Sequence, residues 1–155
     1  RRSLEAMPAP IPAMPPPRPA RWTPDNLQLS ATIIPGGSFT WAEATRGGTR
    51  LPPDQPTVEA IVRLATLAQE ARDRIGRPFI ITSWYRPPEV NARGGGASLS
   101  RHILGDAIDF YCDGITGQQL YWALDPWWPG GLGRYTRFPS LCHLDARDYR
   151  VRWVH

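Results

Sequence analysis

The sequence predicts an α+β fold in which helices flank a small antiparallel sheet. The strongest helical periodicity lies in the first half of the chain, and short β-branched and aromatic runs dominate the second half. Helices and strands do not alternate regularly, so a doubly wound parallel sheet is not expected. The 155 residues suffice for one domain with a substantial core.

The first 25 residues differ in composition from the rest of the chain. The segment MPAPIPAMPPPRPARWTP has proline at almost every second or third position. Proline cannot take part in a regular helix or sheet ladder and favours an extended polyproline conformation. We therefore expect residues 1–25 to form a linker or tether and residues 26–155 to form the functional domain. A proline-rich ligand for a partner domain is the alternative for the first segment.

Three helices are expected within the domain. Residues 39–48, FTWAEATRGG, have the pattern of a short helix closed by glycines. Residues 56–76 carry apolar side chains at three- and four-residue spacing on one face, with proline at the start and glycine at the end. Residues 116–124, TGQQLYWAL, open with a Thr-x-x-Gln capping box.

The expected strands are short and lie mostly after the long helix. Residues 86–100 between the first two strands are expected to form a loop that can include one helical turn. The strands are predicted at residues 77–84, 107–112, 130–135, 141–146 and 149–155.

The charge of the chain is mildly basic. Lys and Arg together number 18 against 14 Asp and Glu, which gives a net charge of +4, and all the positive side chains are arginines. This balance suits an acidic polymer such as nucleic acid or an anionic cell wall. The chain has no basic run of the kind that follows phosphates, so we expect no nucleic-acid partner. No window is apolar enough to predict a transmembrane segment.

Two stretches carry the side chains with candidate chemistry. In SLSRHILGDAIDFYC, His102 lies on a turn and Asp109 on a strand, with Gly105 between them. In SLCHLDARDYR, His143 lies on a second strand. If the two strands pair, the three side chains can converge, and two imidazoles with one carboxylate are a catalytic zinc set that leaves a position for water. The alternative is ordinary structural roles, with surface histidines and an aspartate paired to an arginine.

These stretches resemble a known family. SRHILGDAID follows the pattern Ser-x-His-x-x-Gly-x-Ala-x-Asp and resembles the first motif of the D-alanyl-D-alanine carboxypeptidase family of zinc peptidases. That family shares a fold with vancomycin-resistance D,D-dipeptidases and the hedgehog signalling domain. ITSWYRPPEVN is similar to the family's Ser-x-Tyr-Arg segment, and GGLGRY with CHLDARDYRVRW is similar to the closing segment of its cell-wall-hydrolase branches. The resemblance covers roughly residues 50–153.

The resemblance implies roles for particular residues. His102, Asp109 and His143 correspond to the ligands of Zn²⁺. Arg86 corresponds to the arginine that holds the carbonyl or carboxylate of the substrate, where a planar, permanently charged fork of donors can stabilise an oxyanion. An ion pair within the fold is the alternative role for Arg86.

Other side chains are candidates for contact with the substrate. Ser100 either binds the substrate or orders the turn before His102. Tyr85 is a second candidate for substrate binding, and Tyr135 can reach the cleft in the same way. Trp127 and Trp128 form either a stacking wall or part of the core.

One position departs from the family pattern. Many members place an acidic general base three residues before the last zinc histidine, and others place a histidine two residues before it. These positions are Ser140 and Leu141 here. Asp145, which shares the face of His143 along the strand, is the substitute candidate for the catalytic base, and Asp106 is a weaker one. The alternative for Asp145 is a supporting role behind the metal ligand.

The two cysteines lie on the same two strands as the ligands. Alternation turns Cys112 and Cys142 to the face opposite Asp109 and His143. They either form a disulfide, in agreement with an oxidising compartment, or remain two buried thiols.

The expected function is that of a zinc-dependent peptidase. Its substrate is expected to be a peptide of peptidoglycan, cleaved as a D,D-carboxypeptidase or an endopeptidase, and its location extracytoplasmic. The alternative is a non-catalytic, zinc-stabilised module of the hedgehog kind that binds the cell wall or a protein. Because the expected base is missing, both functions stay open at this stage.

Overall fold

The computed structural model describes residues 7–11, 14, 16–96 and 100–155. In this part of the chain the fold is α+β, as predicted, with a five-stranded mixed sheet. The helices are α1 (Trp41–Ala44), α2 (Gln55–Ile75), α3 (Pro88–Arg93), α4 (Arg101–Leu104) and α5 (Gly117–Leu124). The strands are β1 (Ile80–Ser83), β2 (Ala107–Tyr111), β3 (Gly131–Arg134), β4 (Cys142–Asp145) and β5 (Val151–Val154).

The strand order is β1-β2-β4-β3-β5. The first four strands are antiparallel to their neighbours, as expected, but β5 is parallel to β3. The chain reverses after β4, where both edges of β4 are already occupied by β2 and β3. The returning strand therefore pairs with the free edge of β3, and there its direction matches that of β3. The expectation of a fully antiparallel sheet was wrong for this last strand.

The helix ends follow the expected signals. α2 begins after Asp54, whose side chain accepts a hydrogen bond from the Thr57 amide, and it ends at Gly76 with a left-handed φ of 75°. α5 begins with the predicted capping box between Thr116 and Gln119. None of the helices described here combines the length and apolarity needed to cross a bilayer.

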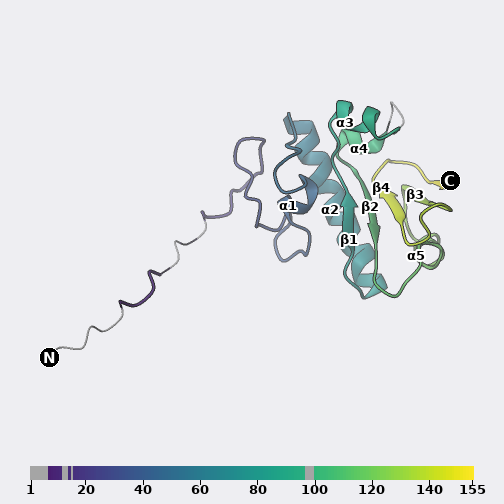
Figure 1. Cartoon of the computed structure of the whole chain (residues 1–155), viewed down its shortest axis with the longest axis horizontal. Coiled ribbons are helices and arrows are strands. Elements are labelled where there is room, and N and C mark those ends of the chain that lie inside the picture. Colours follow the sequence, from purple (N-terminus) through teal and green to yellow (C-terminus); the bar gives the residue numbers. More distant parts are fainter. Residues whose placement is uncertain (1–6, 12–13, 15, 97–99) are drawn as a thin grey trace.

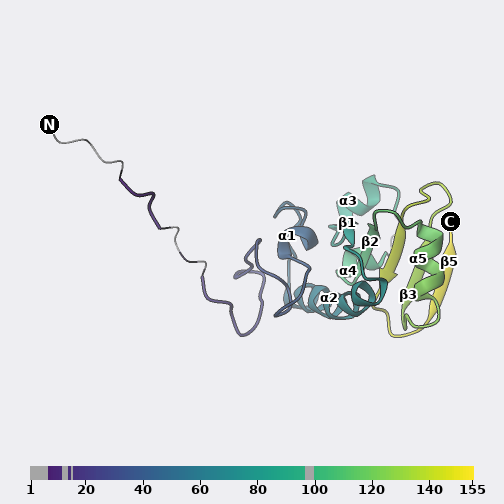
Figure 2. The same cartoon turned by 90° about the horizontal axis from the view of Figure 1, so that it is seen from below.

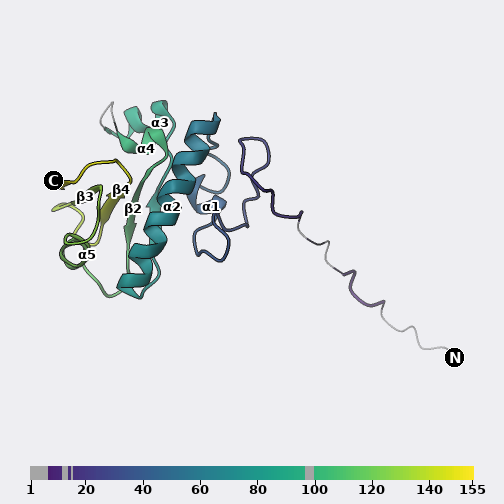
Figure 3. The same cartoon turned by 180° about the vertical axis from the view of Figure 1, so that it is seen from behind.

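The sheet has one face in the core and one face open to a cleft. Ile108, Phe110, Leu132 and Leu144 point into the core and are fully buried. α2 runs along the sheet, behind β1 in Figure 1 and on the near side of the sheet in Figure 3. α5 packs against β3 and β4, as the view from below in Figure 2 also shows. The intervening residues of β2 and β4, which carry the candidate ligands, therefore face away from this core.

The segment before Asn26 is not uniform. Trp22 is buried and donates its indole N–H to the carbonyl of Ile33 at 2.8 Å. Arg18 donates to the carbonyls of Thr32 and Ile33 at 2.6 and 2.7 Å. Contact with the domain begins at Pro17, whose carbonyl accepts a hydrogen bond from Gln28 at 3.2 Å. The described residues further upstream are exposed and lead away from the folded part (Figure 1), and the rest of the expected tether lies outside the described residues.

Candidate metal centre

A single row of paired residues crosses all five strands and forms the floor of the site. Ser83 pairs with Asp109, Asp109 with His143, His143 with Gly133, and Gly133 with Trp153. Directly paired residues point to the same face of a sheet. The row therefore places a hydroxyl, a carboxylate, an imidazole and an indole side by side on the face that is not covered by α2 and α5.

His102 reaches this row from the short helix α4. The Ser100 hydroxyl caps this helix by accepting the His102 amide at 3.2 Å, and Gly105 ends it with φ 93°. A Cβ on Gly105 would lie 3.0 Å from the Thr57 carbonyl of α2, so glycine permits close packing of the turn on α2. The Arg86 amide donates to the His102 carbonyl at 3.1 Å and fixes the turn from the other side.

The three expected ligands converge on one point. Nε2 of His102 lies 3.2 Å from Oδ2 of Asp109, and Nδ1 of His143 lies 3.2 Å from Oδ1 of the same carboxylate. One ligand atom from each residue lies within 4.8 Å of the other two, and all three side chains are buried. The structure thus brings together the set that the sequence suggested.

The other nitrogen of each imidazole has an acceptor that sets the tautomer. Nδ1 of His102 donates to the Trp84 carbonyl at 2.7 Å, because a carbonyl can only accept. Nε2 of His143 donates to Asp145 at 2.8 Å. The nitrogens left with lone pairs are those that face Asp109. Metal-binding histidines typically donate their second ring nitrogen to an acceptor in this way.

The electrostatics keep the two carboxylates ionised. Burial alone would raise the pKa of Asp109, but the adjacent imidazoles of His102 and His143 outweigh it and hold that pKa well below its ordinary value. Burial of Asp145 is likewise outweighed by His143 and Arg147, so its pKa is also low. Burial lowers the pKa of His102, which favours the neutral, metal-binding form.

The residues present fit a zinc ion. Two imidazole nitrogens and a carboxylate oxygen are donors that Zn²⁺ takes in catalytic sites. Within the described residues, Nε2 of His102 is buried and forms no hydrogen bond of good geometry. A buried nitrogen whose lone pair has no partner costs free energy, and a metal ion bound at this point would remove that cost.

The centre lies in an open cleft of about 670 Å³. Arg86 lines this cleft, and its guanidinium NH2 nitrogen lies 3.7 Å from Oδ2 of Asp109. Tyr135 also lines it and donates its hydroxyl to Oδ1 of Asp109 at 2.9 Å. Ser100 lies at the rim, where its oxygen already caps α4. Tyr85 is buried and lines two other cavities rather than this cleft.

Asp145 is fully engaged by its neighbours. Oδ1 accepts from the Gly131 amide at 3.0 Å and from Nε of Arg147 at 2.7 Å, while Oδ2 accepts from His143 and from the second arm of Arg147. A Cβ on Gly131 would lie 2.1 Å from this carboxylate, so the glycine makes room for it. The geometry matches the supporting role for Asp145 and leaves the carboxylate no free position from which to act as a base.

Asp106, the weaker candidate for the base, is also engaged. Its buried carboxylate accepts from Arg63 at 3.0 Å and from Nε of Arg101 at 3.0 Å. This arrangement ties α2 to α4 and thereby holds His102 in place. Ser140 is exposed, and Leu141 brings only an apolar side chain to the cleft.

Two features of the cleft escaped the sequence reasoning. The ring centroid of Trp153 lies 5.0 Å from that of His143, and a Cβ on Gly133 would lie 2.1 Å from the indole. The ring centroid of His155 lies 4.8 Å from that of Trp153, with the two rings tilted by 44°, and His155 also lines the cleft. The motif GGLG offered a signal, because two glycines at alternate strand positions indicate side chains that need their space.

The tryptophan pair and the two cysteines do not line the cleft. Trp128 is buried and donates to the Asp145 carbonyl at 2.9 Å, and Trp127 packs against the core beneath Arg74. These two indoles are therefore core and loop anchors rather than a stacking wall. Cys112 and Cys142 are buried free thiols.

A His–Asp–His donor set at the floor of an open cleft, in an α+β fold, is a site of the type found in metal-dependent hydrolases. The comparison with family models agrees with this class. The model described as Peptidase M15 matches residues 23–145, and the chain belongs to this family of zinc peptidases, which confirms the resemblance. A search of curated proteins found no match.

Proposed function

We propose that this protein is a zinc-dependent peptidase that hydrolyses peptide bonds of peptidoglycan, as a D,D-carboxypeptidase or an endopeptidase. The single observation that supports it most is the convergence of His102, Asp109 and His143 within 4.8 Å at the floor of the 670 Å³ cleft. Membership of the peptidase M15 family supports peptide hydrolysis. The choice of peptidoglycan follows from the resemblance of the closing motifs to cell-wall hydrolases.

The protein side of the mechanism can be assigned from the cleft. When bound by the three ligands, a zinc ion supplies Lewis-acid polarisation of a carbonyl and activation of water. Arg86 is placed to donate to the oxygen on which negative charge develops, and its Nε has no hydrogen-bond partner among the described residues. Tyr135 and Trp153 bound the same space and can position the peptide.

The proton acceptor is assigned to His155. The carboxylates of Asp145 and Asp106 are held by arginines, and burial with the nearby Asp109 charge raises the pKa of Tyr135. His155 is an exposed imidazole of the cleft, and its ring lies beside that of Trp153. An imidazole that is open to solvent can take a proton from water and return it to the leaving amine.

The experiment that tests the function joins metal analysis to product analysis. The purified chain is expected to hold about one zinc ion, since three protein ligands define one site. It should release defined fragments from purified peptidoglycan, as seen by mass spectrometry, lose this activity with a chelator and regain it with Zn²⁺. A zinc-loaded chain that leaves peptidoglycan and its stem peptides intact would overturn the proposal.

A second candidate function is a zinc-stabilised module that binds the cell wall or a protein without hydrolysis. The observation that favours it is the absence of a free carboxylate base among the described residues that line the cleft. The two functions separate in the experiment above. A binding module would unfold on chelation and bind peptidoglycan without releasing any fragment.

The proposed substrate also sets the proposed location. Peptidoglycan lies outside the cytoplasm, so we place the protein in the periplasm, in the cell wall or among secreted proteins. Fractionation of the producing cells, followed by detection of the chain, tests this placement.

A further inference from the structure

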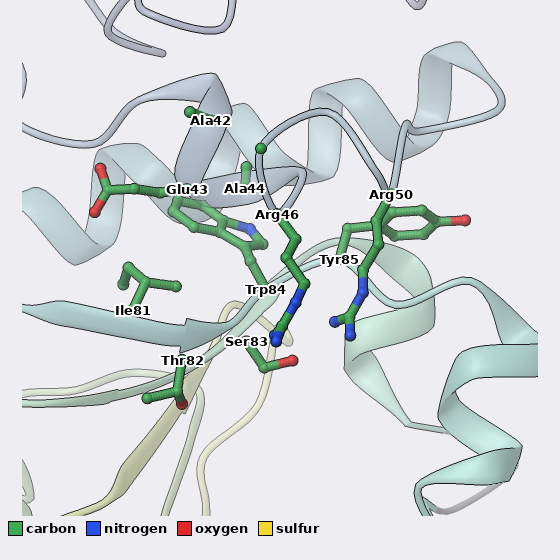
Figure 4. Close-up of a pocket in the computed structure, with 11 residues that line it drawn as sticks. Ala42, Glu43, Ala44, Arg46, Arg50, Ile81, Thr82, Ser83, Trp84 and Tyr85 are labelled. Atoms are coloured by element: carbon green, nitrogen blue, oxygen red, sulfur yellow. The ribbon is translucent and has the colours of Figure 1, made fainter.

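A second cavity, of about 540 Å³, lies beside the metal centre at the edge of the sheet. It is bounded by the end of α1 with the turn that follows, and by β1 with the residues after it (Figure 4). Arg46 and Arg50 enter it from the turn, and both guanidinium groups extend toward Ser83 on β1 (Figure 4). The cavity therefore gathers two permanent positive charges at one end.

These charges are not neutralised by the protein. Within the described residues, neither Arg46 nor Arg50 uses its guanidinium in a hydrogen bond or an ion pair, whereas most arginines near the metal centre do. Glu43 lines the same cavity, but its carboxylate accepts the Thr40 amide at 2.9 Å and points away from both arginines (Figure 4). An anion of the right size would find two unpaired forks of donors here.

Arg50 lies in surroundings that disfavour its positive charge. Burial, followed by the charges of Arg46 and Arg86, lowers the pKa of Arg50. Both effects are unfavourable for the charged form of Arg50, and a bound anion would offset them. Since Arg86 belongs to the metal cleft, the two cavities lie within electrostatic reach of one another.

The backbone of the turn that carries Arg46 is held in place by Thr45. Thr45 is buried, donates its hydroxyl to the Trp41 carbonyl at 2.6 Å and accepts the Gly48 amide at 3.0 Å. Arg46 itself has φ 48°, a left-handed conformation that glycine adopts more readily than arginine. Glycine would adopt this backbone conformation at a lower cost in free energy. The benefit of arginine at this position therefore lies in its guanidinium group.

The cavity adjoins the row that carries the metal ligands. Ser83 follows a register irregularity in β1 and is the partner of Asp109 on β2, so their backbones are separated by one strand spacing of about 4.8 Å. The Ser83 hydroxyl is buried and has no hydrogen-bond partner among the described residues. A peptide whose carbonyl lies at the metal centre can therefore continue past Ser83 into the second cavity.

From this placement we infer that Arg46, Arg50 and Ser83 form an anion subsite that binds a second carboxylate of the peptide substrate. The inference rests on the proposed peptidase function. Guanidinium forks match a carboxylate and a phosphate equally well. The carboxylate is chosen because a peptide held across the row brings one without any further partner.

The kinetic test compares two zinc-loaded variants on two peptides. One peptide has a free carboxylate near the cleaved bond, and the other has the same group amidated. The wild-type chain should prefer the free carboxylate by about five- to tenfold in kcat/KM, since each exposed pair contributes a factor of a few. In R46Q/R50Q the preference should fall to about one, with the amidated peptide cleaved as before.

The matched control is R74Q/R77Q, which removes the same charge from two exposed positions, one in the last turn of α2 and one just after it, and should keep the preference. Both variants should unfold at temperatures near that of the wild type. A preference that survives in R46Q/R50Q, or an equal loss on both peptides, would overturn the subsite.

A binding test gives an answer even if no peptide is cleaved. Glutarate and inorganic phosphate are titrated into the zinc-loaded wild-type chain and both variants, and binding is followed by NMR. Glutarate affinity should fall at least fivefold in R46Q/R50Q and stay constant in R74Q/R77Q. Equal glutarate affinity in all three chains would overturn the inference, and so would phosphate that binds more tightly than glutarate at this site.

Discussion

Nε2 of His143 lies 2.8 Å from Oδ2 of Asp145, two residues further along the same strand. The alternation of β4 makes this contact possible, because residues two apart share a face. Asp145 is held in turn by Arg147 and by the Gly131 amide. The carboxylate therefore acts on the site through His143, by directing its free nitrogen toward Asp109.

Asp145→Asn should weaken zinc binding about 10- to 100-fold, because a neutral amide supports the imidazole less well than a carboxylate. Competition with a chromogenic chelator measures the affinity. Asp125→Asn is the control, since Asp125 is a partly exposed carboxylate that also pairs with two arginines but lies away from the metal centre. Unchanged affinity in Asp145→Asn would show that His143 needs no such support.

Arg86→Lys separates charge from geometry in the cleft. Lysine keeps the positive charge but lacks the planar fork, so kcat should fall by about 10²-fold as one oxyanion donor is lost. Zinc content should remain at the wild-type value, because Arg86 is not one of the three ligands. Steady-state kinetics on a stem peptide, together with metal analysis, checks both halves. A rise in KM with constant kcat would assign Arg86 to ground-state binding instead.

His155→Gln tests the assigned proton acceptor. We expect kcat to fall by about 10²-fold with KM nearly constant, because general-base catalysis contributes about 10²- to 10⁴-fold. Added imidazole should restore part of the activity of this variant. Gln at this position keeps a polar side chain beside Trp153, so stability should change little. Full activity in His155→Gln would remove this residue from the mechanism and would favour an acceptor supplied by the substrate or by solvent.

Gly133 and Trp153 should show strong coupling in a double-mutant cycle. A methyl group at position 133 would overlap the indole, so Gly133→Ala should lower the free energy of unfolding by about 1–3 kcal/mol through overpacking. In a Trp153→Ala background, the same exchange should change it by less than about 0.5 kcal/mol. Urea denaturation measures all four chains. Additive effects would contradict the close contact seen across β3 and β5.

The cysteines give a prediction about thiol chemistry and pH. Alkylation in denaturant without a reductant should find two free thiols in each chain, and slow labelling should be seen in the folded state at pH 8. Burial raises the pKa of Cys112 to about 11 and that of Cys142 further still, above the ordinary value near 8.5. Folding favours the neutral thiols, so their contribution to stability is complete below about pH 8.5. It should be lost as pH rises through about 11.

The pH prediction is checked by urea denaturation between pH 7 and 11. Cys112→Ser removes one of the two groups and should flatten the decline, although its stability at pH 7 will differ for packing reasons. A disulfide found in the purified chain, or a Cys112→Ser profile as steep as that of the wild type, would contradict the prediction.

Much of the fold was predictable from local signals. The periodicity of α2, the capping box of α5 and the positions of four antiparallel strands depend on neighbouring residues, and the structure has them where they were expected. The direction of β5 was not predictable in this way. It depends on which strand edge remains free after β3 and β4 have paired. The local sequence of residues 149–155 carries no information about that edge.

The sequence by itself determined which side chains can bind a metal, because imidazole and carboxylate chemistry belongs to the residue and the motif spacing belongs to the chain. Only the tertiary structure decided how they are used. The Trp84 carbonyl that orients His102 is a backbone group and leaves no mark in the sequence. Likewise, the row from Ser83 to Trp153 and the cavity of Arg46 and Arg50 exist only because segments far apart in the chain pack against one another.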